Sequence, residues 1–252
     1  MVKVSIIGSG NVAQHLIAAF LKSNEIEVVQ VFSRNPNDIA ALISVDKITS
    51  DIATLQQADV YIIAISDSAV ASVSQQFSFT DRLVVHTSGS LPIEIIDAKN
   101  RRGVFYPLQT FSKGIHLDFK EIPICLEAED TNDLPTLQKV AWALSDKIFH
   151  INTPQRKALH VAAVFANNFT NHLYGIAAEI CEENKIPFDI LKPLIRQTAD
   201  KTMQLQPKAA QTGPAIRHDD ITIKSHLSFL EDESRKNIYE ILTKSIQHDA
   251  SL

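Results

Sequence analysis

Residues 2–13 read Val2-Lys3-Val4-Ser5-Ile6-Ile7-Gly8-Ser9-Gly10-Asn11-Val12-Ala13, an apolar run followed by the pattern Gly-x-Gly-x-x-Ala. The apolar run predicts a strand, and residues 12–21 carry a helical pattern directly after it. Gly8 allows a tight turn, Gly10 lets a pyrophosphate approach the backbone, and Ala13 lets the helix pack closely on the strand. The free N–H groups at the helix N-terminus attract phosphates. The stretch therefore predicts dinucleotide binding, with an ordinary strand-to-helix turn as the alternative; the predicted contacts are Gly8, Ser9, Gly10, Asn11 and Val12.

Composition excludes several other classes of protein. A net charge of -5 and a pI near 6.0 do not indicate a nucleic-acid partner. The sequence has no apolar run of the ~18 residues that a membrane-spanning helix needs, and it begins with a strand pattern in place of a signal peptide. Cys125 and Cys181 are isolated and lack metal-ligand spacing, so we expect two reduced thiols, no metal and a cytoplasmic location.

Strand and helix patterns alternate through the first 152 residues. Such alternation predicts an α/β domain with a doubly wound, mostly parallel sheet that is covered on both faces. The expected strands are Val2–Ile7, Glu27–Phe32, Val60–Ile65, Leu83–His86, Val104–Tyr106, Ile122–Leu126 and Ile148–Ile151. The expected helices are Val12–Leu21, Ile39–Leu42, Val70–Gln76, Ile93–Ala98 and Leu134–Leu144.

After Asn152 the pattern becomes helical throughout. Thr153 is a candidate N-cap and Pro154 suits the first helical position, so a helix of about 30 residues is expected up to Asn184. Further helical patterns cover Phe188–Leu205, Asp220–Leu230 and Glu233–Gln247. We therefore expect two domains, a nucleotide-binding domain of residues 1–152 and an all-helical domain of residues 153–252.

The end of the second predicted strand indicates which dinucleotide binds. An NAD site usually places an acidic residue there, on the ribose hydroxyls. This chain has Ser33 and Arg34 at that position, and a guanidinium suits a 2′-phosphate. We therefore expect NADP, with a solvated surface arginine as the alternative. Ile65 and Ser66, at the carboxyl end of another strand, are expected to contact the cofactor as well.

Two loops after strands carry polar residues into the predicted crevice. The first reads His86-Thr87-Ser88-Gly89-Ser90, and Ser88 is expected to hydrogen-bond a substrate or the nicotinamide amide. The second, residues 106–111, reads Tyr-Pro-Leu-Gln-Thr-Phe, and Gln109 is its expected substrate contact. A plain turn is the alternative for the first loop, since serine and glycine are common there.

The long helix is apolar almost all round from Ala158 to Phe169, which predicts that it is buried. His160, Val164, Asn167 and Asn171 fall at i, i+4, i+7 and i+11 and so share one face, with Asn168 beside it. These polar groups either face the cofactor crevice or hydrogen-bond neighbouring helices. Because three short helices cannot cover such a helix, we expect a homodimer built on the helical domain.

A second group of polar residues lies near the end of the chain. The turn Thr212-Gly213-Pro214 leads through Arg217 and His218 to a helix that carries His226. Asp219 or Asp220 is the expected N-cap. Arg217 and His226 are candidate substrate contacts, and a capped surface helix is the alternative reading.

In these features the chain resembles the superfamily of β-hydroxyacid dehydrogenases, pyrroline-5-carboxylate reductases and 6-phosphogluconate dehydrogenases. It most resembles a bacterial branch described as Rossmann-like or deazaflavin-dependent-NADP-oxidoreductase-like. The resemblance rests on residues 8–13, 86–89, 106–111, 160–168 and 212–226. It implies an N-terminal Rossmann domain, an all-helical C-terminal domain that makes the dimer, and hydride transfer between NADPH and a small polar carbonyl or imine. It does not imply that a deazaflavin acts here.

One position departs from that superfamily. β-Hydroxyacid dehydrogenases carry a proton-donating lysine three residues before a pair of asparagines, and Val164 stands at this position before Asn167 and Asn168. His160 lies one turn earlier and is the candidate proton donor. The expected catalytic residues are therefore His160, Asn167, Asn168 and Ser88. The missing lysine also leaves open a non-catalytic NADP-binding sensor or scaffold.

Overall fold

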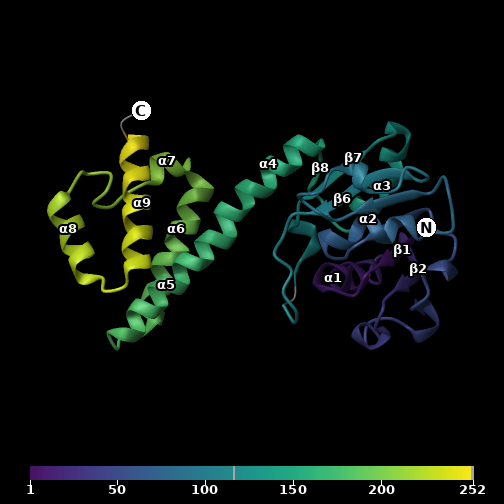
Figure 1. Ribbon diagram of the computed structural model, residues 1–252, viewed down its shortest axis with the longest axis horizontal. Helices are drawn as coiled ribbons and strands as arrows, with labels where there is room; N and C mark the ends of the chain where they lie inside the picture. The colour runs from purple at the N-terminus through teal and green to yellow at the C-terminus, as the bar shows by residue number, and fades with distance from the viewer. Residues whose placement is uncertain (116, 251–252) are drawn as a thin grey trace. The chain divides into compact units, whose positions relative to one another are not determined.

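The computed structural model describes residues 1–115 and 117–250, the last two by their backbone alone. The chain divides into two compact units, Met1–Val164 and Phe165–Leu252, which are an α/β unit and a helical unit (Figure 1). The division falls inside a continuous run of helix that begins after Asn152. The domain boundary expected near Asn152 stays a prediction.

In the described chain, eight strands form one sheet in the order β3-β2-β1-β4-β5-β6-β7-β8. They are β1 Val2–Ile7, β2 Ile26–Phe32, β3 Ile48–Thr49, β4 Val60–Ile63, β5 Leu83–His86, β6 Arg101–Pro107, β7 Ile124–Ala128 and β8 Ile148–His150. β7 runs antiparallel to β6, and the other neighbouring pairs are parallel. The predicted doubly wound, mostly parallel sheet is confirmed.

Helices cover both faces of this sheet. The apolar sides of α1 (Asn11–Phe20) and α3 (Leu134–Trp142) pack with one face in the larger core cluster, in which Phe20 meets Phe105 with 6.5 Å between ring centroids. α2 (Asp67–Gln75) packs on the other face through Val70. β4 is buried along its whole length, as expected for a central parallel strand.

Two short predicted helices are wrong. Ile39–Leu42 follows the 3₁₀ turn Pro36–Asp38, and Ile93–Ala98 contains only the 3₁₀ turn Ile93–Ile95. Ile39 and Ile93 are both buried, so one apolar anchor holds each turn in place. Segments this short cannot repay the cost of nucleating an α-helix.

The long helical run has three parts, α4 (Thr153–Ala163), a π-helix (Val164–Phe169) and α5 (Thr170–Glu183). Asn152, not the predicted Thr153, is the N-cap, because its side chain accepts from the Gln155 N–H in a reciprocal capping box. The π-helix advances fewer degrees per residue than an α-helix. The single polar stripe predicted from His160 to Asn171 is therefore interrupted.

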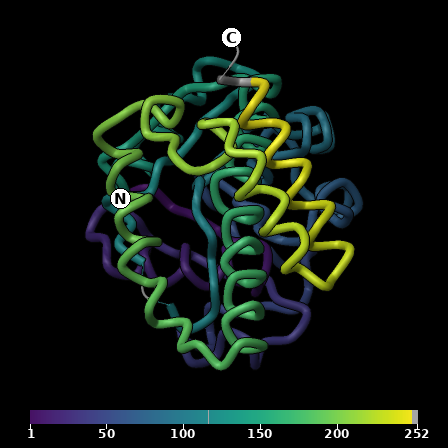
Figure 2. Tube along the Cα trace, turned by 90° about the vertical axis from the view of Figure 1, so that its left-hand side faces the viewer, coloured from purple at the N-terminus to yellow at the C-terminus, as the bar shows by residue number. Residues whose placement is uncertain are grey.

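The helical unit continues with α6 (Lys192–Gln204), α7 (Pro207–Ala210), α8 (Asp220–Phe229) and α9 (Glu233–Ala250). α9 (yellow) lies beside α5 (green) in Figure 2. Arg235 of α9 forms ion pairs with Glu179 and Glu183 of α5. Asp219 caps α8 by accepting from the Thr222 N–H, which confirms one of the two predicted caps.

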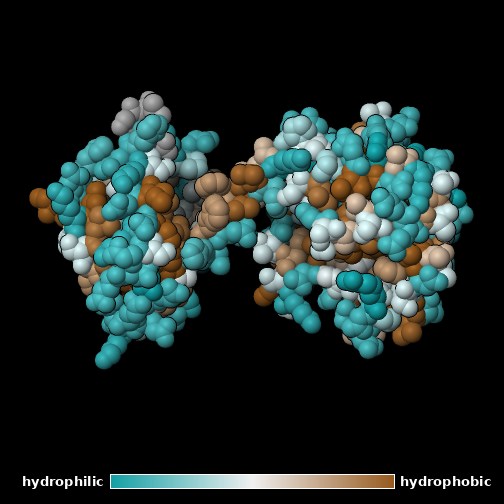
Figure 3. All heavy atoms as spheres, viewed as in Figure 1, coloured by the Kyte–Doolittle hydropathy of each residue, from teal (hydrophilic) through white to brown (hydrophobic). Residues whose placement is uncertain are grey.

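The predicted burial of Ala158–Phe169 is wrong for the single chain. Val161, Phe165 and Phe169 are 56%, 64% and 49% exposed. Apolar side chains also lie open on the face of the helical unit seen in Figure 3. No helix within the described residues is long and apolar enough to cross a membrane.

Candidate active site

The β1–α1 turn has the geometry that a pyrophosphate needs. Gly8 has φ +132°, and a Cβ placed on it would lie 2.2 Å from the Ala64 carbonyl oxygen, so only glycine fits. Gly10 is the N-cap of α1, and a Cβ there would meet nothing within 4 Å. Among the described side chains none caps α1 or places an acid in its first turn. Its first N–H groups are therefore open to an anion.

A cavity of about 670 Å³ opens beside this turn. Its lining includes all nine residues that the sequence predicted as cofactor contacts, from the β1–α1 turn, the end of β2 and the end of β4: Gly8, Ser9, Gly10, Asn11, Val12, Ser33, Arg34, Ile65 and Ser66. It also includes Asn35, Asp38 and Thr87, which sequence reasoning missed. Their role as ligands stays a prediction, but the structure brings them to one place.

Ser33 and Arg34 differ in what they offer to this cavity. Ser33 is 1% exposed, and its hydroxyl donates to the Asn35 carbonyl and accepts from the Asn35 N–H, so it shapes the turn. Arg34 is exposed and, among the described residues, forms no ion pair. Its guanidinium therefore suits the 2′-phosphate better than the serine does.

His160 meets Tyr106 beside the loop that follows β5. Its Nδ1 lies 3.0 Å from the Tyr106 hydroxyl, with the two rings edge to face. A Cβ on Gly89 would lie 2.6 Å from that same nitrogen, so glycine lets the loop approach the pair. Thr87, two residues earlier, lines the cofactor cavity. The pair and the cavity therefore meet the same loop after β5, at residues that are two apart in the sequence.

Burial raises the pKa of Tyr106 to about 12, with a smaller contribution from Cys125. The phenol therefore stays protonated at neutral pH. Tyr106 was quoted from the sequence as the start of a loop but was not predicted as a site residue. It is the last but one residue of β6, and a strand-end position of this kind is the signal that identifies it.

Ser88 is held in a tight local network. Its hydroxyl donates to Asp67 at 2.9 Å and accepts from the backbone N–H groups of Ser90 and Leu91. Asp67 begins α2. This geometry supports a role in fixing the loop that carries Gly89, and the predicted substrate contact of Ser88 stays a prediction.

A buried ion pair anchors α4 about one helical turn before His160. Arg156 is fully buried; it pairs with Glu127 on β7 and also donates to the Leu91 carbonyl and to Thr153. Arg156 precedes His160 by four residues, so both are on the same helix face. The ion pair thus fixes α4 against the sheet and the loop, and it was not predicted.

His86 lies under the same loop and is fully buried. Burial lowers its pKa to about 4, with the nearby Arg156 charge as a second cause. Its Nδ1 accepts from the Ser88 N–H at 3.2 Å, so the neutral ring carries its proton on Nε2. Nε2 of His86 and Nε of Arg156 have no hydrogen-bond partner among the described residues.

The remaining predicted residues lie elsewhere. Gln109 is exposed in the loop after β6, where its Oε1 accepts from the Thr110 N–H. Asn167 and Asn168 are exposed in the π-helix. Arg217 is exposed, and Nδ1 of His226 lies 2.8 Å from the Tyr239 hydroxyl. These last four belong to the helical unit, and their participation stays a prediction.

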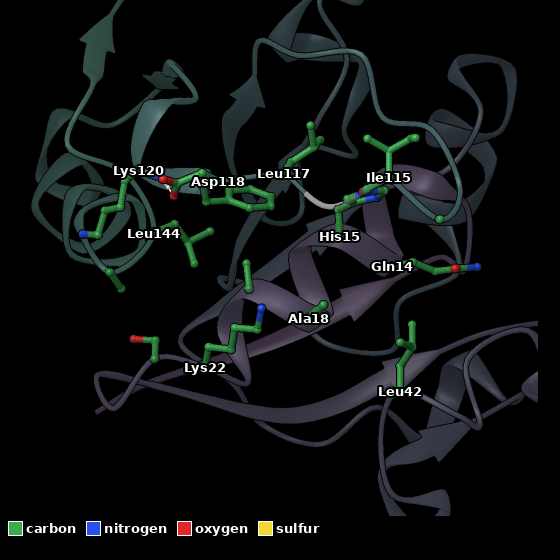
Figure 4. A pocket seen from close by; sticks show the side chains of 15 residues that line it. Gln14, His15, Ala18, Lys22, Leu42, Ile115, Leu117, Asp118, Lys120 and Leu144 are labelled. Atoms are coloured by element: carbon green, nitrogen blue, oxygen red, sulfur yellow. Dashed lines mark hydrogen bonds between the residues drawn. The ribbon is translucent and has the colours of Figure 1, made fainter.

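A second cavity, of about 550 Å³, lies along α1, whose residues Gln14, His15 and Ala18 line it (Figure 4). His15 lies at its edge, with Nε2 3.0 Å from the Ile115 carbonyl oxygen, and Lys22 and Lys120 also line it. Its described lining includes no predicted site residue. Among the described residues there is also no group of three His, Cys, Asp or Glu side chains that could hold a metal.

Known proteins resemble the whole chain. It is 41% identical to a "putative NADP oxidoreductase" from Bacteroides fragilis, whose crystal structure matches with a TM-score of 0.88 over 98% of each chain. Residues 3–89 match the family described as NADP oxidoreductase, coenzyme F420-dependent. The chain belongs to the Rossmann-like NADP oxidoreductase family. Residues 122–246 match a domain of unknown function, DUF2520.

More distant structures share the fold of this family. A protein from Thermotoga maritima is 22% identical with a TM-score of 0.77 over 98% of each chain. An imine reductase from Myxococcus stipitatus, solved with NADP+, is 15% identical with a TM-score of 0.66 over 98% of this chain and 92% of its own. No curated protein sequence matches the chain. The predicted resemblance is confirmed, and the predicted cofactor, NADP, is one of the two that the family description names.

Proposed function

We propose that this chain is an NADPH-dependent reductase of small polar imines or carbonyls in which His160 supplies the proton. The observation that carries the proposal is the hydrogen bond between His160 and Tyr106 beside Gly89. The loop that this pair contacts at Gly89 also contributes Thr87 to the cavity that contains the glycine-rich turn. A proton donor is thus held next to a dinucleotide cradle, as reduction of a C=N or C=O bond requires.

Bound NADPH supplies the hydride to the carbon of the double bond. The nitrogen or oxygen of that bond takes up a proton, which we assign to Nε2 of His160. In the imidazolium form, Nδ1–H donates to the Tyr106 oxygen and Nε2–H remains free to give. The raised pKa of Tyr106 prevents the phenol from losing its own proton, so the tyrosine orients the ring. His160 then recovers its proton from solvent.

The cofactor fit supports NADPH over NADH. The N-terminus of α1 and Gly10 leave room for the pyrophosphate, and Arg34 lies at the β2 end of the cavity. A guanidinium there binds a 2′-phosphate through forked, charge-assisted hydrogen bonds.

The substrate contacts of the proposal come from the sequence. Ser88 and Gln109 are assigned to the substrate side of the first unit. Asn167 or Asn168 is assigned to substrate orientation, and Arg217 and His226 to a polar or anionic substrate group. These roles are consistent with the exposure of Gln109, Asn167, Asn168, Arg217 and His226.

We also propose that the chain forms a homodimer through its helical unit. Within the described residues of that unit, the buried hydrophobic residues are Cys181, Ala215 and Ile223, whereas Phe165 and Leu194 are more than 60% exposed. With so few buried residues, the helical unit leaves much apolar surface exposed, and the helical unit of a second chain would bury it. Light scattering that gives the 28.0 kDa of one chain would contradict this.

A panel of small imines and carbonyls, followed by NADPH absorbance, tests the proposed activity. We expect turnover with at least one member, and we expect His160→Gln to lower it by roughly 10²–10⁴ with NADPH affinity nearly unchanged. His150→Gln is the matched control, because His150 is an exposed histidine with its own partner, Gln138. Tight NADPH binding with no turnover across the panel would favour the sensor or scaffold instead.

A further inference from the structure

Asp38 and Arg34 are the charged residues in the described lining of the cofactor cavity, and they have opposite signs. The Asp38 carboxylate accepts from the Ser9 hydroxyl at 3.1 Å and from the Asn35 side-chain amide at 2.9 Å. Ser9 belongs to the glycine-rich turn, and Asn35 follows Arg34. The carboxylate therefore bridges the two segments that would hold the pyrophosphate and the adenosine ribose.

Gln14 of α1 reinforces this bridge. The Gln14 side-chain amide donates to the backbone carbonyls of both Ser9 and Asp38, at 2.8 and 3.4 Å. Among the described residues Asp38 forms no ion pair. Its carboxylate therefore has only neutral hydrogen-bond donors and keeps its negative charge in the cavity lining. A negative charge there repels a phosphate and occupies two donors that a phosphate would use.

A carboxylate in this part of a dinucleotide site is also an acceptor for ribose hydroxyls. The lining therefore contains the group that favours a ribose, Asp38, next to the group that favours a 2′-phosphate, Arg34. The acid could not be predicted from the strand tip, because Asp38 is the last residue of the 3₁₀ turn that follows β2.

We propose that Asp38 is the specificity-determining residue that limits the preference for NADPH over NADH, and that a 2′-phosphate binds only when the Asp38 bridge to Ser9 and Asn35 opens. The inference rests on the proposed NADPH site. It predicts a protein that accepts both cofactors more evenly than Arg34 alone would allow.

Calorimetry with NADPH and NADH on the full chain tests this, with Asp38→Asn as the variant. Asparagine removes the charge and keeps one of the two acceptor oxygens that hold Ser9 and Asn35. We expect the ratio of the NADH to the NADPH dissociation constant to rise on the order of tenfold, because one unit charge is removed beside a dianionic phosphate. The increase should shrink at high salt, since the charges are exposed and screened.

Two smaller probes isolate the adenosine half. We expect Asp38→Asn to tighten binding of 2′,5′-ADP and to leave 5′-AMP within about twofold, since only the former carries the 2′-phosphate. Asp130→Asn is the matched control. Asp130 is likewise exposed and holds a 3₁₀ turn, but it lies outside the cavity lining. It should leave the cofactor ratio unchanged.

The outcomes separate the two levels of the hypothesis. Wild-type protein that binds neither dinucleotide would contradict the proposed function itself. Wild-type protein that binds NADPH, with an Asp38→Asn variant that changes the cofactor ratio less than twofold, would overturn the specificity role of Asp38. An equal gain for NADPH and NADH would overturn it as well, because that result assigns Asp38 to the pyrophosphate.

Discussion

Gly89→Ala is a test of the His160–Tyr106 pair that removes no polar atom. Gly89 has no positive φ, so alanine is allowed by the backbone and any effect is steric. The new Cβ would lie 2.6 Å from Nδ1 of His160 and 2.8 Å from Cζ of Tyr106. Ordinary contacts between such atoms are about 3.5–4.0 Å. The rings or the loop must therefore shift by roughly 1 Å.

The magnitude follows from two contributions to the free energy of unfolding. Overpacking of this kind costs about 1–3 kcal/mol, and loss of the Tyr106–His160 hydrogen bond costs about 0.5–1.5 kcal/mol more. We therefore expect a loss of about 2–4 kcal/mol. A displacement of about 1 Å in a proton donor lowers turnover on the order of 100-fold, whereas NADPH affinity should hardly change.

Urea unfolding followed by tryptophan fluorescence measures the first effect, because Trp142 is the one tryptophan and lies on α3 of the α/β unit. Gly175→Ala is the control: a Cβ at this position of α5 meets nothing within 4 Å, so the variant should be neutral or slightly stabilising. Unfolding of Gly89→Ala within about 0.5 kcal/mol of wild type, with turnover unchanged, would contradict the predicted steric clash.

Three further predictions concern neighbouring groups. His86 has its usual pKa of 6.5 in the unfolded chain, whereas burial lowers its pKa to about 4 in the folded protein. The free energy of unfolding should therefore fall by about 3 kcal/mol as the pH drops from 6.5 to 4. A His86→Gln variant whose free energy of unfolding depends on pH as strongly as that of wild type would contradict this prediction. Arg156→Met removes the ion-pair partner of Glu127 and should lower the free energy of unfolding by roughly 3–5 kcal/mol. Adding Glu127→Gln should recover part of this loss. Strictly additive losses in the double variant would contradict an energetic coupling between the two residues. Arg34→Ala should weaken NADPH binding by roughly 1.5–3 kcal/mol and NADH binding much less; calorimetry that gives equal losses would exclude a 2′-phosphate contact.

The sequence predicted those parts of the fold that depend on local patterns. β5, Leu83–His86, has its expected bounds, and α1 begins one residue before the predicted start. β3 was missed because two residues carry no periodicity. The π-helix at Val164–Phe169 was missed because the sequence there continues the same helical pattern as the α-helices on either side.

The site divides in the same way. The lining of the cavity beside the β1–α1 turn could be predicted in part, because Gly8 to Val12 are contiguous and their spacing reflects backbone geometry. The pairing of Tyr106 with His160 spans 54 residues and depends on how Arg156 anchors α4 to β7, which no local pattern records. Asp38 also remained hidden, since only the fold of the turn after β2 brings its carboxylate to Ser9.

The most direct test of His160 as the proton donor is NADPH oxidation by wild type, His160→Gln and His150→Gln with one active imine or carbonyl substrate, beside calorimetry with NADPH. We predict that His160→Gln lowers turnover by roughly 10²–10⁴ while it binds NADPH normally, and that His150→Gln keeps both. A His160→Gln variant that keeps wild-type turnover would contradict His160 as the proton donor.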